Sequence, residues 1–90
     1  MKKEKFSISI GEQKTDILID SKEFIDYEKK NNQNAKNFFL INKAIKKLYN
    51  DTYFWVGNND DMRQGTIFSF NKLNDLVPIS DTITASIKKI

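Results

Sequence analysis

Residues 35–49, with the sequence AKNFFLINKAIKKLY, carry the strongest helical pattern in the chain. On one helical face of this stretch, apolar residues recur mainly three or four positions apart. They are Phe38, Ile41, Ile45, Leu48 and Tyr49. We therefore expect a helix over 35–49 that closes the core with this face. Phe39 and Leu40 lie off the face, where they either pack on a second layer or contact a partner.

Upstream of this helix, the pattern predicts two strands and another helix. Phe6, Ile8 and Ile10 alternate with serines, as in a half-buried strand, and a turn over 11–14 leads to a second strand over 16–20. The next helix is expected over 21–30, with Asp20 as its cap and Glu23 completing a capping box. Residues 31–34, with the sequence NNQN, form a turn between this helix and helix 35–49.

Downstream, aromatic and β-branched residues over 52–56 and 66–70 indicate a hairpin, 52–70, with a long polar tip. A short helical turn is expected over 71–76, because Pro78 then ends it, and the alternation over 82–88 indicates a last strand. The chain, residues 1–90, is thus predicted to be one α+β domain. Its expected element order is β-β-α-α-β-β-(short α)-β.

The composition argues against catalysis. The chain has neither histidine nor cysteine, so it lacks the commonest general base, the commonest metal ligands and the thiol nucleophile. We expect no enzymatic activity, cofactor, metal or small-molecule substrate. No stretch approaches the roughly 18 apolar residues of a membrane span, and the N-terminus continues as an alternating strand where a signal peptide would be apolar. A cytoplasmic protein without membrane contact is therefore predicted.

Positive charge is concentrated in one segment. Residues 29–50 carry six lysines and no acid, whereas residues 1–28 and 51–90 have net charges of −2 and −1. On a helical wheel, Lys36, Lys43 and Lys47 lie opposite the apolar face, with Lys46 at its margin. Lysines contact phosphates and asparagines read base edges, so the pattern favours DNA binding. The alternative is an ordinary amphipathic helix with a solvated lysine face.

Arg63 is the only arginine of the chain and lies beside Gln64 in the tip of hairpin 52–70. An arginine on a projecting hairpin suits insertion into a narrow minor groove. The alternative is a solvated loop arginine that pairs with Asp60 or Asp61.

The succession of helix 21–30, turn, helix 35–49 and hairpin 52–70 resembles the helix-turn-helix and wing of winged-helix DNA-binding proteins. Small accessory proteins of plasmid transfer complexes are one similar group. The chain departs from the family pattern by beginning with a hairpin. The resemblance implies a recognition helix with Lys36, Asn37, Lys43 and Lys47, and wing residues Asn58, Asn59, Arg63 and Gln64.

The sequence thus leaves several functions open. The leading hypothesis is a DNA-binding regulator or DNA-transfer factor that contacts duplex DNA, as a homodimer, through the helix and hairpin residues just named together with Lys46. The alternative is a protein-binding module, such as a phage or mobile-element inhibitor of a host protein. Its contact patch would contain Phe39, Leu40, Trp55 and exposed strand faces. A structural subunit with solubilising lysines is a third reading.

Overall fold

An antiparallel hairpin begins the fold in the computed structural model, which describes residues 3–29, 33–49, 52–58 and 62–90. Strand β1 (Lys3–Ile10) pairs with β2 (Gln13–Asp20), so that Ile8 lies opposite Thr15. The two strands are joined by a tight two-residue turn in which Gly11 adopts a φ of 60°, a value that glycine reaches without steric cost.

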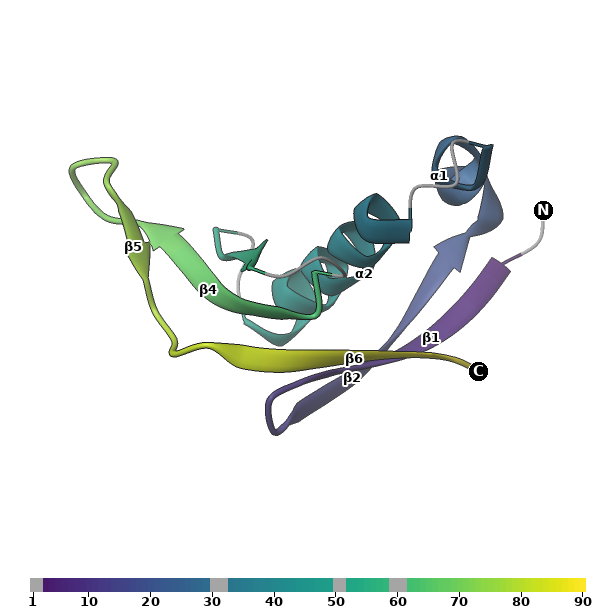
Figure 1. Cartoon of the computed structure of the whole chain (residues 1–90), viewed down its shortest axis with the longest axis horizontal. Helices are drawn as coiled ribbons and strands as arrows, with labels where there is room; N and C mark the ends of the chain where they lie inside the picture. The colour runs from purple at the N-terminus through teal and green to yellow at the C-terminus, as the bar shows by residue number, and fades with distance from the viewer. Residues whose placement is uncertain (1–2, 30–32, 50–51, 59–61) are drawn as a thin grey trace.

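Both hairpins predicted from the sequence lie in one curled sheet (Figure 1). Strand β6 (Ile83–Lys89) joins them, because it pairs with β1 along most of its length and with the start of β4 (Gln64–Phe70) at its own N-terminal end. Strand β3 (Phe54–Gly57) pairs with β4 on the side away from β6. The sheet order is β2-β1-β6-β4-β3, and β5 (Leu76–Pro78) pairs with the end of β4.

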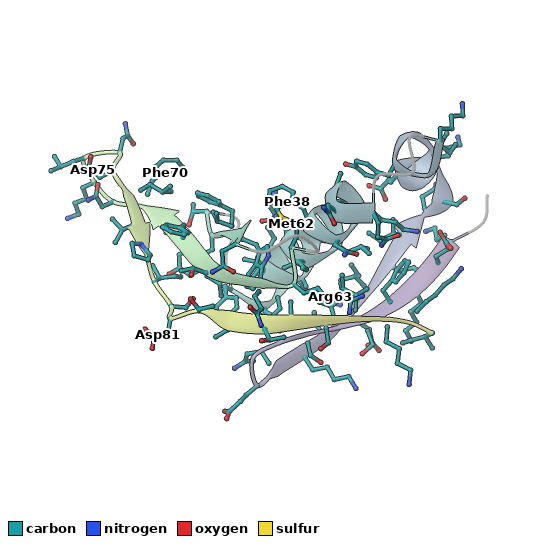
Figure 2. The ribbon with its side chains drawn as sticks, in the orientation of Figure 1. Phe38, Met62, Arg63, Phe70, Asp75 and Asp81 are labelled. Carbon is teal, nitrogen blue, oxygen red and sulfur yellow. The ribbon has the colours of Figure 1, made fainter. Side chains whose placement is uncertain are left out.

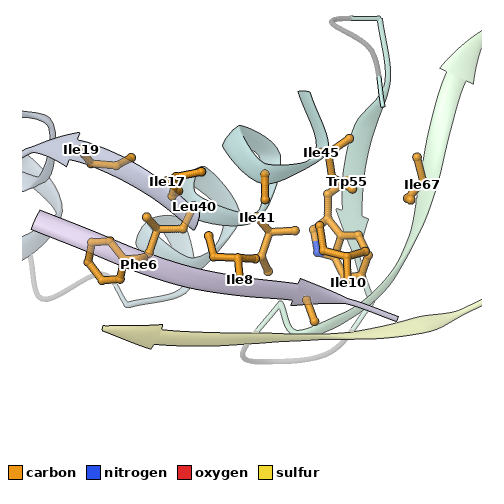
Figure 3. Close-up of a cluster of buried hydrophobic side chains, with 12 residues drawn as sticks. Phe6, Ile8, Ile10, Ile17, Ile19, Leu40, Ile41, Ile45, Trp55 and Ile67 are labelled. Carbon is orange, nitrogen blue, oxygen red and sulfur yellow. The ribbon is translucent and has the colours of Figure 1, made fainter. Parts of the chain in front are cut away.

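Helix α2 (Gln33–Leu48) packs on one face of this sheet and closes the core (Figure 3). It buries Leu40, Ile41 and Ile45, which meet alternate residues of the first hairpin such as Ile8 and Ile19. Full burial of one such side chain stabilises the fold by about 1.5–3 kcal/mol. The predicted strand over 6–10 and the predicted helix over 35–49 are both confirmed in position.

Trp55 fills the second half of the core, between α2 and the second hairpin, and is completely buried. Its indole Nε1–H donates to the Met62 carbonyl over 2.8 Å, so the polar end of the ring is satisfied. Its backbone N–H donates to the Asn42 side chain of α2 over 2.8 Å, which ties the free edge of β3 to the helix. The second hairpin is thereby held at a fixed position against α2.

The predicted helix over 21–30 is wrong as a single element. Asp20 does act as a cap, accepting from the Lys22 N–H over 3.1 Å, but it starts a 3-10 turn (Ser21–Phe24) followed by the five-residue α1 (Ile25–Lys29). Of the apolar side chains that the structure describes in this segment, Ile25 is exposed and Tyr27 is only partly buried against the core, which gives a long helix little support. The described residues on either side of 30–32 do not form a helix-turn-helix of two full helices, and the winged-helix arrangement is not confirmed.

The predicted short helix over 71–76 is also wrong. Asn71 accepts from the Leu73 and Asp75 N–H groups, each over 2.9 Å, and Asn74 adopts a φ of 62°. These contacts form a turn that leads directly into β5, so residues 68–78 are a β-hairpin whose second strand ends at Pro78. Among the described residues, no helix combines the length and the apolar character that crossing a bilayer requires.

Candidate protein-binding surface

The buried face of α2 differs from the face that periodicity alone selects. Leu40, expected off that face, is buried, whereas Phe38 and Tyr49, expected within it, are each 41% exposed. The helix is rotated because Leu40, Ala44 and Ile41 meet the sheet. Phe38 therefore reaches the surface beside β3.

Most of the lysines predicted to contact DNA have partners within the protein. The Lys43 ammonium lies 3.8 Å from the Glu23 carboxylate and 5.4 Å from the centre of the Phe39 ring. Lys47 donates to the Asp16 carbonyl over 2.6 Å, and Lys36 is half-buried. Lys46 is exposed and forms no ion pair with a described residue. The lysines therefore do not form one free cationic face.

The predicted asparagine and hairpin contacts are also dispersed. Asn37 is buried and accepts from the Gln33 side chain over 2.9 Å, so its assignment as a contact to base edges is wrong. Arg63 is exposed, but its carbonyl accepts from the Ala85 N–H, which places it beside β6 (Figure 2). The neighbouring Gln64 is exposed, as is Asn58, whose backbone N–H is bonded to the Gln64 carbonyl. Asn59 lies outside the described residues.

A surface of four phenylalanines, here called the aromatic face, follows the second hairpin onto α2. Phe54 lies opposite Phe68 in the β3–β4 register, and their rings stack at 6.4 Å. Phe70, which follows on the same face of β4, is 5.6 Å from the Phe54 ring and 59% exposed. Phe38 continues the surface on α2, and Figure 2 shows it on the same side of the molecule as Phe70.

Where the aromatic face meets α2, it forms a pocket of about 360 Å³, here called the aromatic pocket. Three further aromatic rings and three polar side chains complete its lining with Phe38: Tyr27, Phe39, Phe54, Asn42, Lys43 and Lys46. The Tyr27 and Phe39 rings lie 5.9 Å apart and form part of its wall. The structure thus brings together two of the predicted lysines, but it places them around an apolar pocket.

The β4–β5 hairpin beyond Phe68, residues 68–79, projects from the body of the molecule and is here called the arm (Figure 1). It exposes Phe70, Leu73, Leu76 and Ile79, of which Leu73 is 81% exposed. The molecule is elongated, with extents of 41, 25 and 22 Å, and its surface is 6117 Å². A compact monomer of 10.5 kDa would expose only about 5400 Å². The molecule thus exposes more surface than a compact monomer of its mass, and the arm is one part of it that exposes large apolar side chains.

A second hollow, of about 500 Å³, lies on the sheet face opposite α2 and is lined mainly by polar groups, including Ser7, Lys14 and Lys88. Its Asp16 carboxylate lies 3.8 Å from the Lys5 ammonium, a surface ion pair. Within the described ranges, no three carboxylates gather as they would to hold a metal ion.

Sequence reasoning missed the exposure of Phe38 and Phe70 and the part-buried positions of Phe54 and Phe68 beside them. It placed Leu40 and Trp55 in a contact patch, and that is wrong because both are buried. Phe39, placed in the same patch, does line the aromatic pocket. The sequence feature that could have revealed this surface is that β4 carries large apolar residues on both of its faces.

Comparisons with models of protein families, with curated proteins and with solved structures find no match to this chain.

Proposed function

We propose that this chain is a protein-binding module and that the aromatic face, with its pocket, is the contact surface. The observation that carries the proposal is the exposure of Phe38 and Phe70 on one surface that continues through Phe54. Aromatic side chains concentrate the binding energy of protein interfaces, because each ring buries a large area at a small cost in conformational entropy. The proposal takes up the second of the hypotheses raised by the sequence.

The chemistry of the pocket selects an apolar segment with acidic neighbours. The rings of Phe38, Phe39 and Phe54 would contact an aliphatic side chain, and Lys43 and Lys46 would meet carboxylates beside it. Lys46 is the more available of the two lysines, because Lys43 already faces Glu23. Apolar contact supplies the affinity of such a site, whereas the lysines supply its orientation and its preference for acidic partners.

A peptide titration tests the proposal. The probe is a fluorescein-labelled synthetic peptide in which two leucines are flanked by aspartates, and its anisotropy is followed as the chain is added. A matched peptide with lysines in place of the aspartates is expected to bind at least about tenfold more weakly, since both charge contacts become repulsive. Equal binding of the two peptides would contradict the proposal.

Two variants and a matched control assign the binding to the pocket. Phe38→Ser removes an exposed wall of the pocket and is expected to lower the affinity for the acidic peptide by about tenfold or more. Lys46→Glu reverses the charge at the rim of the pocket and is expected to lower the affinity for the acidic peptide by several-fold. Lys88→Glu makes the same charge change on the opposite sheet face and is expected to leave the affinity unchanged.

Duplex DNA binding remains a second candidate, favoured by the five lysines and the absence of acids within the described parts of 29–50. The same anisotropy measurement with an AT-rich duplex tests it at two salt concentrations. DNA binding through these lysines would weaken steeply as salt is raised, because counterions are released from the phosphates. Loss of that binding in Lys46→Glu and Lys47→Glu, with Phe38→Ser unaffected, would favour DNA over a protein partner.

A further inference from the structure

We infer that the partner of the aromatic pocket is the arm of a second copy of this chain, so that two copies exchange arms across a two-fold axis. This inference rests on the proposed function and names the partner. The tip of the arm presents the two side-chain types that the pocket selects. Leu73 is 81% exposed, and Asp75, two residues on, is exposed with no ion pair to any described residue.

The two halves of the contact lie apart on one molecule. Asp75 lies at the tip of the arm and Phe38 at the pocket, and Figure 2 shows them well separated. The base of the arm is fixed by bonds from Ile79 N–H to the Ile67 carbonyl, over 2.8 Å, and from Ile67 N–H to Ser80 Oγ, over 3.0 Å. These bonds hold the arm away from its own pocket, so the complementary surface must come from another copy.

Charge and reciprocity favour a closed dimer. The arm tip carries Lys72 and Asp75 on either side of Leu73, and in the inferred contact the Leu73 side chain enters the aromatic wall while Asp75 meets Lys46 and the exposed Lys72 stays in solvent. Each copy offers one arm and one pocket. A two-fold arrangement satisfies both contacts at once and leaves no free arm to extend a chain of subunits.

The exposed area agrees with the size of such an interface. The surface of 6117 Å² exceeds that of a compact monomer of this mass by about 700 Å². One partner of a standard stable interface contributes about 800 Å². An interface of standard size between two copies would therefore remove an area comparable to this excess.

Sedimentation velocity of the full chain over a micromolar concentration range tests the dimer. Lys46→Glu and Asp75→Lys are each expected to raise the dimer dissociation constant by about tenfold or more, because each change occurs at both contacts. The double variant restores the opposite charges and is expected to return within about threefold of the parent. A double variant as weak as the singles would overturn the pairing, and oligomers that keep growing with concentration would overturn the two-fold closure.

The absence of cysteine allows a direct proximity test. A mixture of the single variants Leu73→Cys and Lys46→Cys is expected to form a disulfide-linked dimer under mild oxidation, at least about tenfold faster than Leu73→Cys mixed with Lys88→Cys. Equal rates in the two mixtures would overturn the inference. Leu73→Asp provides a chain with a free pocket for the peptide titration. If the Leu73→Asp chain binds the acidic peptide while the parent chain stays monomeric, the inference fails and the proposed function stands. If the parent chain stays monomeric and the Leu73→Asp chain does not bind the acidic peptide, both fail.

Discussion

Replacing Gly65 with alanine is expected to destabilise the fold, because there is no room for a Cβ between Gly65 and the Trp55 ring. A Cβ at this position would lie 2.8 Å from Trp55 Cζ2 and 2.9 Å from Cε2, and it would also press on the Val56 carbonyl. Real Cβ atoms essentially never approach so closely. Gly65 lies opposite both Ile83 of β6 and Gly57 of β3, so a shift of β4 here would also move the arm and the aromatic face.

The magnitude follows from two opposing effects. Overpacking of a well-packed core costs about 1–3 kcal/mol. Alanine regains about 0.5–1 kcal/mol over glycine in a strand, because glycine loses more backbone freedom on folding. Since Gly65 does not have a positive φ, backbone strain adds nothing. Gly65→Ala should therefore lower the free energy of unfolding by about 1–2 kcal/mol.

A double-mutant cycle with Trp55→Phe separates the contact from other causes. Phenylalanine lacks the second ring that contains Cζ2 and Cε2, so it relieves the contact with an added Cβ. Trp55→Phe alone should cost about 2–4 kcal/mol, from the cavity and from the lost hydrogen bond to Met62. In the double variant, we expect the effect of Gly65→Ala to shrink by about 1 kcal/mol or more.

The assay is urea-induced unfolding followed by circular dichroism, since Trp55 is the only tryptophan and its replacement removes the fluorescence signal. The measured quantity is the free energy of unfolding of the parent, the two single variants and the double variant. Effects that add within about 0.5 kcal/mol would refute the close approach of Gly65 to the Trp55 ring.

Substitutions at three further positions test other parts of the account. Asn42→Ala should lower the free energy of unfolding by about 1–3 kcal/mol, because the Trp55 backbone N–H loses its acceptor. Asn42→Asp keeps an acceptor and should lower it by less. Comparable losses in the two variants would argue against this hydrogen bond. Asp20→Ala should cost about 1 kcal/mol through loss of the cap on Lys22 N–H and should leave peptide affinity unchanged, as measured by unfolding and by anisotropy. Leu73→Asp should change stability by less than about 0.5 kcal/mol, since this side chain is 81% exposed; a larger loss on urea unfolding would mean that Leu73 supports the fold itself.

The sequence allowed the first hairpin and the position of the long helix to be predicted, because their patterns are unambiguous. Serines separate the apolar residues of β1, so only one face of that strand can enter a core. The α2 pattern fixes the helix but not its rotation, because apolar residues from Phe38 to Leu48 cover more than one face. The sheet decides that rotation by accepting Leu40 in place of Phe38, and this is a tertiary effect.

Local polar chemistry explains the error at 71–76. Asn71 bonds two following N–H groups, and Asn74 tolerates a positive φ, so a segment that resembled a helical turn forms the turn of a hairpin. The candidate surface could be predicted only in part. Phe68 and Phe70 alternate with Ile67, and a strand that is apolar on both faces does not show which face the helix covers.

Mapping the contact residues by ¹⁵N-resolved nuclear magnetic resonance tests the central claim most directly. The Leu73→Asp chain, which keeps the pocket free, is titrated with the acidic leucine peptide and, separately, with an AT-rich duplex. We expect the peptide to shift the amides of Phe38, Lys46 and Phe54, while residues of the opposite sheet face such as Ser86 do not move. The account would be contradicted if the duplex shifted only Lys47 and the hairpin residues near Arg63 while the peptide caused no shifts.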